Sequence, residues 1–440
     1  MGENGDFVII STLMQAIWKP IKEEFTRYYK EAYSMDLTEL YHLLSQAKMT
    51  SYRYPKAGMN LLSTCGCDHF LKNGTMAGCS MCNYHCNNIR GTAYLKALRD
   101  KDVMLYARVV RDSFVKVRGV LDQQTGEETI TGFNLFSDME FPEQVLEYLF
   151  HTKPIYTVRP FIVSVEARAD SITEKKLKRL IDLIGKGRLV IEIGVEVSRE
   201  WIRNHWLNKN IRDNQILKTI QLCHQYHVKL KADVIFGLPG FTEQNSIGCF
   251  VDTIGWLHDV GCDYIAVMPL NRKEFTLQGC IYDKLRDHPR LTACGIAQAE
   301  HTGLPWIFSF IEALAMCFER FQGIEKKIGI GQYNLTQNSV QNTLFYNESS
   351  LCGCVEETRC AIENYNQRKD GSFILDLHQR RHQDPCYPSY QRLLQKQEKI
   401  TNVLENCRII GDELLKELNL NDPVLLHEWS QEIMEAEKGL

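Results

Sequence analysis

Apolar, strand-like segments alternate with segments of helical periodicity along much of this chain, and this alternation constrains the fold more than any other feature. The strand candidates cover residues 58–64, 128–136, 160–167, 188–196, 229–237 and 263–270. Between them, residues 172–185, 212–226 and 242–257 place apolar side chains at helical spacing. Strands separated by helices pair in parallel and wind right-handedly. The pattern predicts an α/β fold, a partial (β/α)6 barrel with its functional site at the carboxyl ends of the strands.

The flanking segments read differently from the barrel. Residues 1–57 predict a helical N-terminal cap, and residues 58–300 hold the barrel. After residue 300 the strand pattern stops, so residues 301–440 predict a mostly helical, cysteine-bearing C-terminal substrate or accessory region. An apolar fraction of 44% and a charged fraction of 24% are ordinary for globular proteins, which excludes global disorder.

Charge and hydropathy narrow the functional classes. No stretch approaches the 18 or so apolar residues of a membrane span. The N-terminal residues are acidic and lack the basic start of a secretory leader, so we expect a cytoplasmic protein that does not contact membranes. A net charge of −4 offers no overall attraction to nucleic acid.

Sixteen cysteines are unusual for a chain expected in a reducing compartment, where clustered thiols indicate metal rather than disulfides. Five lie between Cys65 and Cys86, directly after the first predicted strand. Cys79 and Cys82 form a C-x2-C pair, and a third thiolate has to come from Cys65, Cys67 or Cys86. An iron–sulfur cluster held by three cysteines would leave one iron open, whereas zinc would take four closed ligands. The spacing of the cysteines is compatible with an iron–sulfur cluster and with zinc.

The cysteine loop resembles that of the radical S-adenosylmethionine (SAM) enzymes. The usual C-x3-C-x2-C signature is replaced here by a longer spacer, as in the branch that includes archaeosine-forming enzymes and relatives of the elongator catalytic subunit. Residues 63–67 (STCGC) and 77–84 (AGCSMCNY) are similar to that branch's R-T-x-G-C and G-G-C-x-M-C-G-Y. The resemblance implies a [4Fe-4S] cluster on Cys67, Cys79 and Cys82.

Later segments extend the resemblance to about residue 390. Residues 165–168 (VEAR), 194–198 (GVEVS) and 237–243 (GLPGFTE) end the third, fourth and fifth strands as in that branch, while residues 134–138 (NLFSD) depart from its G-S-F-L-D-like turn. A glutamate can accept from ribose hydroxyls or an ammonium, and an arginine can fork onto a carboxylate. The resemblance thus implies that SAM is bound by Met81, Asn134, Glu166, Arg168, Glu196, Ser198 and Leu238.

A second group of cysteines lies in the C-terminal region. Cys352, Cys354 and Cys360 form C-x-C-x5-C, and Cys386 follows 26 residues later. Four thiolates could hold a structural zinc or an auxiliary iron–sulfur cluster. The alternative is a set of partly buried free thiols.

The resemblance implies that the chain uses one electron, from a donor such as flavodoxin or ferredoxin, to cleave SAM to a 5′-deoxyadenosyl radical. We expect that radical to activate a small-molecule or peptide substrate in a biosynthetic pathway. The alternative within the enzyme class is modification of tRNA, which would need a broad basic surface. In an alternative from a different functional class, the chain is a binding protein whose cysteines hold structural zinc.

Overall fold

The computed structural model describes residues 8–46, 50–53, 57–71, 78–84, 86–120, 127–151, 162–331 and 353–438. These residues contain one eight-stranded sheet in which each strand pairs with its neighbours in chain order. The strands are β1 (Thr50–Arg53), β2 (Ala57–Leu61), β3 (Glu127–Thr131), β4 (Ile162–Ala167), β5 (Leu189–Glu196), β6 (Lys229–Phe236), β7 (Tyr264–Pro269) and β8 (Ile328–Ile330). This order is that of a singly wound, partial barrel.

The six predicted strands are confirmed as β2 to β7, which pair in parallel. The sheet is two strands wider than we predicted. β1 pairs antiparallel with β2, inside the segment expected to be a helical cap, and β8 pairs in parallel with β7, beyond residue 300, where no strand was expected. Both are short edge strands of three or four residues, too brief for a periodic pattern to show in the sequence.

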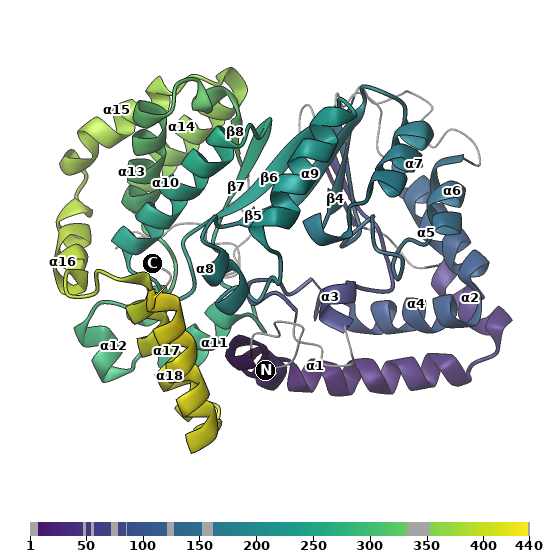
Figure 1. Ribbon diagram of the computed structural model, residues 1–440, viewed down its shortest axis with the longest axis horizontal. Helices are drawn as coiled ribbons and strands as arrows, with labels where there is room; N and C mark the ends of the chain where they lie inside the picture. Colours follow the sequence, from purple (N-terminus) through teal and green to yellow (C-terminus); the bar gives the residue numbers. More distant parts are fainter. Residues whose placement is uncertain are drawn as a thin grey trace.

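Helices connect the strands. They are α3 (Asp68–Leu71), α4 (Ile89–Lys101), α5 (Val103–Val120), α6 (Glu143–His151), α7 (Glu174–Ile184), α8 (Glu200–His205), α9 (Asp213–Gln225), α10 (Glu243–Asp259), α11 (Leu277–Leu285), α12 (Pro289–Ala293) and α13 (Ile307–Arg320). Some of them, such as α9 and α10, pack on one face of the sheet, and others, such as α11, lie at the ends of the strands (Figure 1). The helices predicted over 172–185, 212–226 and 242–257 are confirmed as α7, α9 and α10. Side-chain hydroxyls of Thr173, Thr242 and Thr276 cap α7, α10 and α11, and this fixes where these helices begin after the strands.

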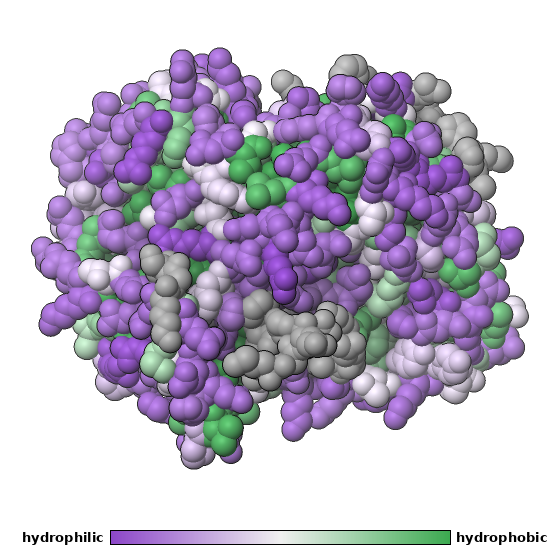
Figure 2. Space-filling view, in the orientation of Figure 1, coloured by the Kyte–Doolittle hydropathy of each residue, from purple (hydrophilic) through white to green (hydrophobic). Residues whose placement is uncertain are grey.

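The remaining helices lie at the ends of the chain. They are α1 (Val8–Ser34), α2 (Leu37–Ser45), α14 (Cys354–Arg368), α15 (Ser372–Arg380), α16 (Tyr387–Gln397), α17 (Val403–Glu417) and α18 (Pro423–Lys438). Helix α1 runs along α4, while α14 and α15 lie beside α13 (Figure 1). The visible surface is mostly hydrophilic, with smaller hydrophobic areas between the polar side chains (Figure 2).

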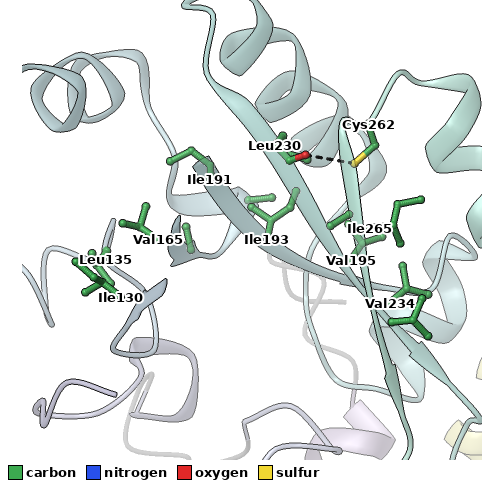
Figure 3. Close-up of a cluster of buried hydrophobic side chains, with 14 of the residues drawn as sticks. Ile130, Leu135, Val165, Ile191, Ile193, Val195, Leu230, Val234, Cys262 and Ile265 are labelled. Carbon is green, nitrogen blue, oxygen red and sulfur yellow. Dashed lines mark hydrogen bonds between the residues drawn. The ribbon is translucent and has the colours of Figure 1, made fainter. Parts of the chain in front are cut away.

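Alternation along the strands gives the sheet two different faces. Val165, Ile191, Ile193, Leu230 and Val234 are fully buried and point toward the covering helices, where they form the main core (Figure 3). Residues of the opposite, inner face are polar and partly exposed, among them glutamates of β4 and β5 and a lysine and an aspartate of β6. A second apolar cluster, around Trp18, Trp206 and Trp429, joins α1, α11, α17 and α18 at the carboxyl ends of the strands.

Candidate active site

The cysteine loop begins where β2 ends. Leu62 still donates from its backbone N–H to the carbonyl of Thr131, which carries the chain alongside β3, and Cys67 follows at the start of α3. The backbone N–H of Cys82 donates to the carbonyl of Cys79 at 3.1 Å, the tight turn expected of C-x2-C. Residues 72–77 of the spacer lie outside the described residues.

Cys67 and Cys82 both lie within electrostatic range of Cys79, and Cys86 lies within range of Cys82. Burial, with a contribution from Cys79, holds the pKa of Cys67 well above its ordinary value, and burial and the charge of Cys79 raise the pKa of Cys82 to about 11. Cys65 points elsewhere: it is fully buried, its N–H donates to Tyr106 Oη at 3.2 Å and its thiol donates to the carbonyl of Met139 at 3.5 Å. The described thiols Cys67, Cys79, Cys82 and Cys86 therefore form a chain of neighbours, whereas Cys65 is bonded elsewhere.

Three cations adjoin these thiols, namely Arg168, Lys209 and Lys273, and the last of these is in range of Cys82. Arg168 is 8% exposed, binds Asp170 Oδ2 at 3.1 Å and donates to the carbonyl of Lys209 at 2.7 Å. Burial opposes its charge, but Asp170, Cys79 and Cys67 together raise its pKa. Arg168 thus forms its ion pair with Asp170.

Lys209 is the second cation and was missed from the sequence. Its ammonium binds Glu196 at 2.5 Å, and only 9% of its side chain is exposed. Burial lowers its pKa, yet Glu196 and Cys79 outweigh burial and raise the pKa above its ordinary value. Gly194 makes room for this ion pair, because a Cβ there would lie 2.2 Å from the ammonium nitrogen.

Glu196 owes its position to an irregular end of β5. The register between β5 and β6 shifts between Gly194 and Glu196, and Glu196 has a φ of 66°. Residues other than glycine rarely adopt this left-handed backbone conformation. It costs energy and persists only where the surrounding structure holds it in place. The bulge brings the carboxylate toward the ammonium of Lys209.

Further charged side chains of β4, β5 and β6 interact with one another on the inner face of the sheet. Glu192 accepts from Ser164 at 3.0 Å and binds Lys231 at 2.7 Å. Burial and the charge of Glu192 raise the pKa of Glu166 to about 7, and burial with the same neighbour holds the pKa of Asp233 well above its ordinary value. Glu192, Lys231 and Asp233 were also missed, although each is visible as a charged residue that alternates with apolar residues in its strand.

Asn134 lies in the loop after β3 and is fully buried. Its Oδ1 accepts from the backbone N–H of Phe136 and Arg168 and from the hydroxyl of Ser171, which fixes the orientation of the amide. Its Nδ2 is buried without an acceptor among the described residues. Glu140 holds the same loop, since its carboxylate accepts from the backbone N–H groups of Phe133 and Asn134, each at 2.8 Å.

The other predicted cofactor contacts are less central. Ser198 donates from its backbone to Thr253 Oγ1 on α10 at 2.9 Å, and the two hydroxyls lie 3.2 Å apart. Leu238 is buried in the apolar cluster at the strand ends, and Met81 packs against that cluster while staying partly exposed. The structure therefore places Ser198 against α10, and Leu238 and Met81 in and against the apolar cluster at the strand ends.

The C-terminal cysteines divide into two groups. The sulfurs of Cys354 and Cys386 lie 3.3 Å apart and both side chains are buried, so α14 and α16 meet at this thiol pair. Cys360 is exposed on α14, where its thiol donates to Glu356. Cys352 lies outside the described residues. The described members of the predicted second site do not all converge.

Comparison with known proteins gives distant matches. No protein-family model matches the chain. An uncharacterized protein of Methanocaldococcus jannaschii is 22% identical over 254 residues, which cover 58% of this chain and 62% of that protein. The chain thus spans about three fifths of the length of this curated relative.

Several solved structures are distantly similar to the chain. They include the radical SAM methyltransferase TsrM of Kitasatospora setae (14% identity, TM-score 0.34, 52% of this chain and 41% of that one). They also include the Escherichia coli radical SAM enzyme HemN (13%, 0.30, 46% and 44%). A third is archaeal Elp3 of Methanocaldococcus infernus (13%, 0.38, 61% and 60%). Because these matches are distant, we base the functional proposal on the residues of the site.

Proposed function

We propose that the chain is a radical SAM enzyme, with a [4Fe-4S] cluster on Cys67, Cys79 and Cys82. The observation that carries this proposal is the grouping of these thiols with Arg168 and Lys209 at the carboxyl ends of parallel strands. A structural zinc site needs no buried cations beside its thiolates, whereas cations there suit an anionic cofactor group.

The residues present fit such a cluster. Thiolates are the ligands that iron–sulfur clusters take, and each of three cysteines would bind a different iron. Within the described residues, no three His, Cys, Asp or Glu side chains are close enough together to hold a single metal ion. A loop with three thiolates at the carboxyl ends of the strands supplies the ligand type that such a cluster takes.

The polar groups around the thiols match the chemistry of SAM. The guanidinium of Arg168 can fork onto a carboxylate, and the buried Nδ2 of Asn134 is a donor that lacks an acceptor among the described residues. Glu196 and Glu166 can accept from ribose hydroxyls or an ammonium. When bound, cluster and SAM would supply a 5′-deoxyadenosyl radical; the chain's own groups orient the cofactor and exclude water from it.

The inner face supports a small polar substrate. Two of its carboxylates are paired, Glu196 with Lys209 and Glu192 with Lys231, while Glu166 and Asp233 form no ion pair with a lysine among the described residues. Both have raised pKa values, and a cation or strong donor beside them would relieve their burial. We therefore propose a small molecule or peptide with an amino or similar donor group, in preference to a polyanionic tRNA.

The proposed reaction also needs an outside electron donor, and a flavodoxin or ferredoxin fits that role. Among the described helices, none is long and apolar enough to cross a membrane.

The test is metal content after anaerobic reconstitution with iron and sulfide. We expect about four irons and four sulfides per chain, and an electron paramagnetic resonance (EPR) signal after reduction that changes when SAM is added. Cys67→Ala should lose the signal, while Cys65→Ala, its matched control two residues away, should keep it. Bound zinc without iron uptake would support the zinc-stapled binding protein instead.

A further inference from the structure

A buried turn, residues 205–209 between α8 and α9, lies directly against the cysteine loop. Trp206 and Leu207 are fully buried, Asn208 is 3% exposed and Lys209 is 7% exposed. The turn is anchored from behind by Arg203, also fully buried, whose guanidinium donates to the carbonyls of Val197, Ser198 and Ile211 at 2.7–3.0 Å. The turn therefore has a fixed place from which to hold another segment.

It holds the cysteine loop on both sides of Cys79. On one side, the backbone N–H and the hydroxyl of Ser80 donate to the carbonyls of Leu207 and Trp206, at 2.9 and 2.8 Å. On the other side, Nδ2 of Asn208 donates to the carbonyl of Gly78 at 2.6 Å. Cys79 thus lies between two anchored neighbours.

Asn208 links three segments at once. Besides Gly78, its Oδ1 accepts from the hydroxyl of Ser11 on α1 at 3.0 Å, and its backbone carbonyl accepts from Nε2 of His69 at 2.6 Å. His69 follows Cys67 by two residues, so both parts of the cysteine loop reach the same asparagine. Asn208 has a φ of 52°, a left-handed conformation that asparagine tolerates better than most residues.

We propose that Asn208 is a positioning residue for the cluster, which acts through Gly78 to hold the thiolate of Cys79 in place. This inference rests on the proposed function. The side chain of Asn208 reaches Gly78 but carries no group that ligates iron. Its loss leaves the Gly78 carbonyl without this donor and frees one flank of Cys79, so the cluster dissociates faster while the fold persists.

The experiment measures the rate at which an iron chelator removes the cluster, in anaerobic protein well below its unfolding temperature. Asn208→Gly keeps the left-handed backbone free of strain and deletes only the side chain. Asn210→Gly is the matched control, because Asn210 has a φ of 53° and lies two residues further on. We expect several-fold faster iron loss in Asn208→Gly, with the thermal midpoint and the rate of Asn210→Gly close to wild type.

A second variant covers the case in which Asn208→Gly does not fold. Asn208→Asp keeps the acceptor for Ser11 and removes the donor to Gly78, so it too should lose iron faster. Wild-type rates in the folded Asn208 variants would overturn the inference while leaving the proposed function intact, as would equal acceleration in Asn210→Gly. Wild-type protein that takes up no iron would overturn both.

Discussion

Buried charges on the inner face are individually costly, and their pairing explains the residues around them. Lys209 and Glu196 leave water together, which is favourable only when the two groups meet at close range. Gly194 provides the space for that meeting, and the bulge at Glu196 provides the direction. The ion pair therefore depends on three features together: the glycine at position 194, the bulge at Glu196, and Lys209 in the turn after α8.

Gly194→Ala tests this dependence. The added Cβ would meet the Lys209 ammonium at 2.2 Å and a carboxylate oxygen of Glu196 at 2.6 Å, so the ends of these side chains must shift. We expect the free energy of unfolding to fall by about 1–3 kcal/mol, because the added methyl group overpacks the site and displaces the ion pair from its close geometry. Gly248→Ala in α10, where a Cβ meets nothing within 4 Å, is the control and should stabilise by about 0.5–1 kcal/mol. Urea unfolding of both variants gives the comparison, and equal effects would contradict it.

Glu243 gives a pH-dependent prediction away from the cysteines. Burial at the start of α10 raises its pKa from 4.5 to about 7, although Ser309 and Trp306 donate to it. Between these values the folded state binds more protons than the unfolded state, so stability falls as pH rises. Glu243→Gln removes this titration. Between pH 5 and pH 8 the variant should lose less stability than wild type, by on the order of 2 kcal/mol. The measurement is the urea midpoint of both proteins as a function of pH. If the two midpoints change with pH in parallel, Glu243 does not titrate in this window.

At the scale of elements, the strands of the barrel could be predicted from sequence because each is an apolar run bounded by charge, glycine or proline. β1 and β8 could not, because three or four residues show no period. The cysteine loop was recognisable because its ligands lie close together in sequence. Lys209 and Asn208 were not, since only the fold brings their turn beside that loop, and nothing in the residues WLNKN marks them. Asp233 and Lys231 left a usable signal, lone charges at alternate positions of an apolar strand.

Helix α18 closes the apolar cluster under the site, and this gives a prediction at the same scale. Trp429 is 1% exposed, and its ring lies 6.3 Å from that of Trp206, which belongs to the turn beside the cysteine loop. Trp429→Ala should lower the free energy of unfolding by about 3–5 kcal/mol through the cavity it leaves. Met434→Ala on the same helix, where the side chain is 43% exposed, should change it by less than about 0.5 kcal/mol. Similar losses in both variants would mean that α18 does not pack as described.

At the scale of the whole molecule, the C-terminal helices share the core of the barrel. Tyr365 of α14 is fully buried, and its hydroxyl donates to the carbonyl of Ile328 in β8 at 3.0 Å. Tyr390 of α16 packs on Phe308 of α13, with ring centroids 5.5 Å apart. The sheet and the helices after residue 353 therefore bury one another's apolar surface.

A chain that ends at residue 331 tests this shared core. It would expose Phe308 and the outer side of β8, so we expect aggregation and the loss of a cooperative thermal transition. Size-exclusion chromatography and circular dichroism of the shortened and full chains provide the measurement. A monomeric, cooperatively melting product would show that the barrel is independent of its C-terminal helices.

The central claim is the reaction class, and the formation of 5′-deoxyadenosine tests it most directly. Reconstituted protein is incubated anaerobically with dithionite and SAM, and the product is quantified by mass spectrometry. The account predicts 5′-deoxyadenosine from the wild type and from Cys65→Ala, and none above background from Cys79→Ala/Cys82→Ala. Equal yields from wild type and the double variant, or no product from iron-loaded wild type, would contradict it.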